Sequence, residues 1–143
     1  MDLRESIFGL AQAYRTHIKD AVNANELGLN GMHVRCLHTI AKLPQCTANT
    51  IVQQLGKDKA QIARLIKDMI AKGWLEKKSS EQDKRSQILT LSKSGAQLQQ
   101  QLSHLEKNLE ESITAGLTTQ EVEDFQRVST KMLANLAAHT WNE

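Results

Sequence analysis

The sequence predicts a mainly α-helical fold with a small antiparallel β-wing of two to three strands. Apolar residues recur every three or four positions over most of the 143 residues, which is the spacing of helices with one buried face. A single proline and an aromatic content of 3% also favour helices over strands. One stretch, residues 74–92, alternates instead and has a charged centre, as a hairpin would. The length suits one domain, residues 1–143.

The first expected helix spans residues 3–22 and has one apolar stripe. The stripe consists of Leu3, Ile7, Leu10, Tyr14, Ile18 and Ala21 or Val22. Gly28 is suited to stop the chain's helical run, and Asn30 is suited to cap a second helix at 31–43. The residues expected to face inward on this second helix are Val34, Leu37, Ile40, Ala41 and Leu43.

Two helices separated by Gly56 come next and form a helix-turn-helix pattern. Thr47 would cap the short one, whose expected buried side is Ala48, Ile51, Val52 and Leu55. The other spans about 58–72, ends at Gly73 and would bury Ile62, Leu65, Ile66, Met69 and Ile70. Its expected outward face offers side chains that suit base edges and phosphates, namely Lys59, Gln61, Arg64 and Lys67.

The hairpin that follows would be the wing of a winged helix-turn-helix covering residues 31–91. Its strands are expected at 74–80 and 86–92, with a charged tip between them. In that tip, Lys84 and Arg85 could lie along a phosphate backbone or in a minor groove. Asp83 could orient Arg85 or cap the turn. The alternative is an ordinary solvated hairpin tip, but the order of the elements favours a wing.

Two long helices complete the chain. The stripe of the first is Leu98, Leu102, Leu105, Leu109 and Ile113. Thr118 and Glu121 have the spacing of a capping box for the second, whose stripe is Val122, Phe125, Val128 or Ser129, Met132 and Leu136. The terminal segments 1–24 and 92–140 therefore need an apolar partner. In so small a chain the simplest partner is a second copy, so we expect a homodimer with long dimerisation helices.

Positive charge is concentrated in the middle of the chain, although the net charge is only +2. Residues 57–93 hold ten Lys or Arg and five Asp or Glu, whereas residues 94–143 hold three and seven. A polyanion would therefore be attracted to the middle, although a solvated basic face is the alternative. No apolar run is long enough to cross a membrane and the N-terminus is not a signal peptide, so a cytoplasmic location is expected.

Motifs for chemistry are sparse. The two cysteines form no C-x-x-C, the five histidines are scattered, and there is no phosphate-binding loop or nucleophile elbow. We therefore expect no catalytic site, no metal site and no cofactor. His33 and His38 are five residues apart, which puts them on different faces of a helix.

Taken together, these motifs resemble the MarR family of bacterial winged-helix transcription regulators. The most specific parts are "IAKGWLEKK", "DKR" and "LTLSKSG", in which Asp83, Arg85 and Gly95 match the family's wing pattern. The resemblance implies that Arg85 contacts DNA, that the helix before Gly73 enters the major groove, and that the terminal helices form the dimer. Ala60 and Ala63 stand where the family usually has Ser or Thr, so the base preference should differ from that of relatives.

The resemblance also implies regulation by a small aromatic or anionic effector that relieves DNA binding. A crevice for it is expected near Tyr14, His17, Ile18, His33 and Cys36, although Tyr14 and Ile18 could instead be core residues. Cys36 is expected to be a buried thiol rather than an oxidant sensor. The expected function is a DNA-binding regulator such as a repressor, acting on double-stranded DNA at a pseudo-palindromic operator. The alternative is a winged-helix protein-interaction module whose basic surface binds an acidic partner.

Overall fold

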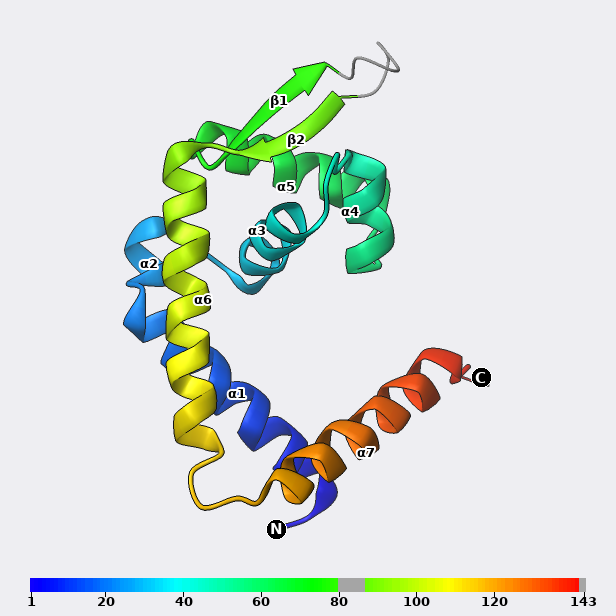
Figure 1. Ribbon diagram of the computed structural model, residues 1–143. Coiled ribbons are helices and arrows are strands. Elements are labelled where there is room, and N and C mark those ends of the chain that lie inside the picture. Colours follow the sequence, from blue (N-terminus) through cyan, green and yellow to red (C-terminus); the bar gives the residue numbers. More distant parts are fainter. Residues whose placement is uncertain (80–86, 142–143) are drawn as a thin grey trace. The chain divides into compact units, whose positions relative to one another are not determined.

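In the computed structural model, the residues described are 1–79 and 87–141. Within them the chain is mainly helical, with a two-stranded antiparallel wing (Figure 1). The elements in chain order are α1 (Leu3–Ala21), α2 (Ala24–Leu27), α3 (Gly31–Lys42), α4 (Ala48–Leu55), α5 (Lys59–Ala71), β1 (Leu75–Ser79), β2 (Gln87–Leu91), α6 (Lys93–Ile113) and α7 (Thr119–Ala138). None of the helices in the described part is both long and apolar enough to cross a membrane.

The chain divides into two compact units, Met1–Glu106 and Lys107–Glu143. The first unit contains the helix-turn-helix, the wing and the root of α6. In this unit, α3 contacts α4, α5 and the wing strand β2 (Figure 1). The second unit contains the outer end of α6 and the whole of α7.

Side-chain caps begin the helices where the sequence predicts them. Asn30, Thr47 and Thr118 each accept a hydrogen bond from the backbone N–H three residues on, which satisfies one of the free donors of a first turn. Gly28 and Gly73 have φ angles of 67° and 80°, a region that glycine enters without strain. These local signals were confirmed. The short helix α2 directly precedes Gly28 and was not predicted, because four residues are too few to show a helical period.

The core of the first unit comes mainly from α3, α4 and α5. Its fully buried side chains include Cys36, Leu37, Cys46, Ile51, Ile62, Met69 and Leu102. Two residues expected to be buried, Ala41 and Ala48, are exposed. Ala48 is the first residue of α4 and Ala41 lies in the last turn of α3. Spacing gives the direction of a side chain, whereas its depth depends on whether a neighbouring element covers that end of the helix.

The two strands of the wing pair from Leu75 with Leu91 to Ser79 with Gln87. Leu89 on β2 is buried. Its N–H donates to the carbonyl oxygen of Cys46 at 2.7 Å, which ties β2 to the turn before α4. The described wing therefore has two strands and one additional backbone bond to the helix-turn-helix.

The root of the wing is joined to the start of α6 by a small set of polar contacts. Ser94 Oγ donates to the carbonyl oxygen of Gly73 at 2.8 Å, and Ser92 Oγ bonds to the same oxygen. The N–H of Ser92 donates to the carbonyl oxygen of Trp74 at 3.0 Å, and Ser92 Oγ accepts from the N–H of Gly95 at 3.0 Å. The end of α5, the wing and α6 therefore share one junction.

Burial decreases along α6. Leu98 and Leu102 are buried, Leu105 and Leu109 are half-buried, and Ile113 is exposed. In the second unit, α7 buries none of its residues, and Phe125 and Leu136 are 61% and 70% exposed. The outer end of α6 and α7 thus present apolar side chains to solvent in the single chain.

Candidate nucleic-acid interface

Helix α5 begins at Asp58, whose carboxylate accepts a hydrogen bond from the N–H of Gln61 at 2.8 Å. A carboxylate at this position also suits the positive end of the helix dipole. Ile62, Ile66 and Met69 are buried and fix the inner side of the helix against the core. The side chains on the opposite side are exposed to solvent.

All four α5 residues expected to contact DNA are exposed, namely Lys59, Gln61, Arg64 and Lys67. Successive residues of an α-helix are turned by about 100°, so Arg64 and Lys67 lie about 60° apart and point to the same side. Gln61 lies about 60° to the other side of Arg64. Lys59 lies about 140° around the axis from Arg64, and it is the first residue of the helix. Its role as a DNA contact, like that of the others, stays a prediction.

The wing adds positive charge that was not among the expected DNA contacts. Lys77 and Lys78 on β1 are exposed, and both are followed in sequence by the charged tip. Their position next to "SSEQDKR" was the available signal. The expected tip residues Asp83, Lys84 and Arg85 lie outside the described residues, so their roles stay predictions.

The C-terminal part of α5 is held to α3 by a buried histidine. His33 Nε2 lies 2.8 Å from Asp68 Oδ2, and Lys72 Nζ donates to Asp68 Oδ1 at 3.0 Å. The hydrogen bonds from Lys72 and from His33 lower the pKa of Asp68, because both stabilise the carboxylate. His33 also lies edge-on to the ring of Trp74, with centroids 5.4 Å apart. No sequence motif predicted this contact, since its partners are 35 residues apart.

The five residues expected to line an effector crevice differ in exposure. Tyr14 is 40% exposed and His17 is exposed, with His17 Nδ1 2.8 Å from the carbonyl oxygen of Ala13. Ile18, His33 and Cys36 are buried. Both ring nitrogens of His33 have hydrogen-bond partners within the protein. Burial raises the pKa of the Cys36 thiol to about 12, with a further contribution from Cys46, as expected for an unreactive buried thiol.

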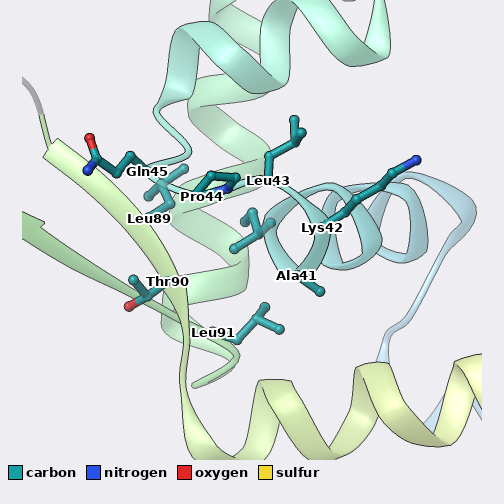
Figure 2. Close-up of a pocket in the computed structure, with 9 residues that line it drawn as sticks. Ala41, Lys42, Leu43, Pro44, Gln45, Leu89, Thr90 and Leu91 are labelled. Atoms are coloured by element: carbon teal, nitrogen blue, oxygen red, sulfur yellow. The ribbon is translucent and has the colours of Figure 1, made fainter.

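A shallow, open hollow lies elsewhere, between the end of α3, the turn that follows it and strand β2 (Figure 2). It is lined by Ile40, Ala41, Lys42, Leu43, Pro44, Gln45, Leu89, Thr90 and Leu91. The five expected effector residues do not contribute to this lining. Among the described residues, no group of three or more His, Cys, Asp or Glu is placed to hold a metal ion.

Three comparisons bear on what this arrangement is. Residues 27–86, which include α3, α4, α5 and the first wing strand β1, match the model of the MarR family. The HTH-type transcriptional regulator PetP of Rhodobacter capsulatus is 28% identical over 134 residues, covering 92% of this chain and 80% of that protein.

Solved structures share the fold over nearly the full length. A MarR protein from Peptoclostridium difficile superposes with a TM-score of 0.77 at 21% identity, covering 95% of this chain and 88% of the other. Wild-type MarR from E. coli in its apo form gives a TM-score of 0.68 at 22% identity, with coverages of 93% and 98%. A mutant of S. aureus MepR bound to an oligodeoxyribonucleotide gives 0.65 at 17% identity, with coverages of 95% and 99%.

The family match falls on the segment where the structure places the exposed face of α5 and the basic wing strand. The relatives are transcription regulators rather than enzymes, in line with the sparse chemical motifs. Over residues 27–86 the chain thus matches the MarR family of transcriptional regulators, and over nearly its full length it has the fold of solved MarR structures.

Proposed function

We propose that the protein binds double-stranded DNA as a homodimer at a pseudo-palindromic operator and that a small-molecule effector relieves this binding. The observation that carries the DNA part is the exposed side of α5, where Gln61, Arg64 and Lys67 stand on a helix fixed from behind by buried residues. Arg and Gln can bond base edges in the major groove, and Lys and Arg can neutralise phosphates.

The wing supports the same proposal. Lys77 and Lys78 extend the positive charge of α5 along β1 toward the tip, where Lys84 and Arg85 follow in the sequence. In this proposal Arg85 contacts DNA, Lys84 adds phosphate attraction and Asp83 orients Arg85. The MepR structure bound to an oligodeoxyribonucleotide shows that a protein of this fold can bind DNA.

The homodimer part is supported by apolar surface on the terminal helices. In the single chain, α1 exposes large apolar side chains, as do the outer end of α6 and α7: Leu3, Ile7, Phe8, Leu10, Ile113, Phe125, Val128, Leu133 and Leu136. Monomers rarely leave so many large apolar side chains uncovered on their helices, and a second copy would cover them. Two-fold symmetry would place two copies of α5 about 34–36 Å apart, one turn of DNA.

The effector part of the proposal rests on the family resemblance. The proposed effector is a small aromatic or anionic molecule that binds near Tyr14, His17, Ile18, His33 and Cys36. Tyr14 and His17 are the exposed members of this set. The buried His33 and Cys36 would be reached only after a local rearrangement.

Binding to duplex DNA across a salt series tests the function. Phosphate neutralisation predicts a steep fall of affinity with salt, by a slope of about 0.9 per phosphate contact on logarithmic axes. The alternative, a module that binds an acidic protein partner, is favoured if the protein shows no affinity for duplex DNA at low salt. Sedimentation at micromolar concentration tests the dimer separately, and a stable monomer there would contradict it.

A further inference from the structure

His33 lies on α3, yet it contacts α5 and Trp74, the residue that directly precedes strand β1. Its Nε2 bonds to Asp68, and its ring packs against that of Trp74 at an interplanar angle of 79°. We propose that His33 is a positioning residue for DNA recognition, because its hydrogen bond to Asp68 fixes how α5 is turned about its own axis. This inference rests on the proposed function and names a residue that acts through α5 without touching DNA.

The ring of His33 is held at both nitrogens. The backbone N–H of Asn30 donates to Nδ1 at 3.0 Å, so Nδ1 is an acceptor and carries no proton. The proton of the neutral ring is therefore on Nε2, which donates to the Asp68 carboxylate at 2.8 Å. The side chain is buried, and Trp74 closes one side of it. A ring fixed in this way cannot follow Asp68 if α5 turns, so the contact resists rotation of the helix.

Asp68 is well placed to control base readout. It lies seven residues after Gln61, which is about two turns, so the two side chains stand on one stripe of α5. A shift of about 1 Å at the surface of a helix of radius about 5 Å turns it by about 10°. Such a turn moves the end of a long side chain by about 1 Å or more, which exceeds the tolerance of a hydrogen bond to a base edge. Phosphate attraction is less directional and would tolerate it better.

Two other roles for Asp68 make different predictions. If the carboxylate mattered only through its negative charge, removing it would strengthen binding to every DNA sequence. If the contact mattered only for stability, removing it would lower the unfolding temperature and leave discrimination between sequences intact. A positioning role predicts a loss of discrimination, measured as the ratio of affinities for preferred and scrambled duplexes.

The test compares Asp68→Ala with Asp68→Asn. Both variants lose the same charge, but asparagine keeps an oxygen that can accept from His33 Nε2. Because the Asp68 side chain is 44% exposed, both variants should fold. Selection from a random duplex pool with the wild-type protein first defines its preferred site. Affinities for that site and for a scrambled duplex are then measured at one salt concentration.

We expect the ratio of affinities to fall about tenfold in Asp68→Ala, the usual size for losing a hydrogen bond to a charged group. In Asp68→Asn it should stay within about threefold of the wild-type value. Both variants should bind the scrambled duplex slightly more tightly, because both lose a negative charge.

A matched control is available on α3, the helix that carries His33. His38 Nε2 lies 2.7 Å from Glu106 Oε1, so it makes the same kind of contact from α3, but toward α6. His38→Ala should lower stability and leave the ratio unchanged. Equal ratios in Asp68→Ala and Asp68→Asn would overturn the positioning role, and so would an equal loss in His38→Ala. If the wild-type protein enriched no sequence at all, the proposed function would fall together with this inference.

Discussion

The carbonyl oxygen of Trp74 lies where a side chain on Gly95 would begin. A β-carbon built on Gly95 would be 2.0 Å from that oxygen, much closer than any non-bonded contact allows. The obstacle is backbone, which cannot turn aside as a flexible side chain can. Helix α6 therefore approaches the wing root closely only because residue 95 is a glycine.

Gly95→Ala should consequently destabilise the fold by about 3 kcal/mol, because the start of α6 must move away from the wing root. Urea denaturation followed by circular dichroism would measure the change. Gly31→Ala is the matched control, since a β-carbon at Gly31 meets nothing within 4 Å. If the two substitutions had equal effects, the close approach of α6 to Trp74 would not matter to stability.

Gln61→Ala should relax the preference at one base pair of each half-site, at a cost of about 1–3 kcal/mol for the preferred site. Gln61 is exposed on α5 and has both a donor and an acceptor for a base edge. Binding-site selection with the variant would measure this, and an unchanged preferred sequence would exclude Gln61 as a reader. Arg64→Ala gives the comparison. If Arg64 contacts only a phosphate, its loss should weaken binding to all sequences alike.

Asp83→Ala should weaken DNA binding even though it removes a negative charge, because we propose that Asp83 orients Arg85. The control is Glu81→Ala, which removes the same charge from the same stretch and should strengthen binding slightly. Arg85→Ala should weaken binding and flatten the salt slope by about 1 per protomer. The test measures the affinities of these variants for DNA at one fixed salt concentration. Tighter binding by Asp83→Ala would mean that Asp83 does not orient Arg85 and that the tip acts only through its charge.

The contribution of Asp68 to stability should depend on pH in one direction. Lys72 and His33 lower the pKa of Asp68 in the folded protein, so the carboxylate stabilises the fold at pH values above its ordinary, unfolded pKa of about 4. That contribution is lost as the pH falls through the lowered pKa. The difference in unfolding free energy between wild type and Asp68→Ala should therefore be present at pH 7 and shrink below pH 4. Lys72→Met should reduce the pH dependence, and a difference that stays constant down to pH 2 would contradict the assignment.

Neither cysteine should react readily in the folded protein. A thiol with a pKa of about 12, as burial and Cys46 give Cys36, is ionised in about one molecule in ten thousand at pH 8. Cys46 is also fully buried, and burial raises its pKa as well. Iodoacetamide labelling followed by mass spectrometry should show slow modification in buffer and rapid modification of both residues in guanidinium chloride. Fast labelling in buffer would indicate frequent opening of the core.

Local signals in the sequence predicted local structure well. Asn30, Thr47 and Thr118 act as caps because a cap needs only the three residues that follow it. Spacing likewise predicted the direction of Ile62, Ile66 and Met69 on α5. It failed at Ala41 and Ala48, since coverage at the end of a helix depends on elements distant in sequence.

The contacts that hold the site together could not be predicted in the same way. The bond from His33 to Asp68 and the approach of Gly95 to Trp74 join residues whose proximity depends on how α3, α5 and α6 pack. His33 and His38 lie five residues apart and face different sides of α3, but only the structure shows that one contacts α5 and the other α6.

The position of Trp74 also gives the protein an optical probe of its own. The chain has two tryptophans, of which Trp74 is 6% exposed at the meeting point of α3, α5 and the wing, while Trp141 is 89% exposed. Acrylamide should quench the emission of Trp141 first and leave a blue-shifted signal from Trp74. A Trp141→Phe variant would isolate that signal, so fluorescence could follow rearrangements of the junction during DNA binding without an added label.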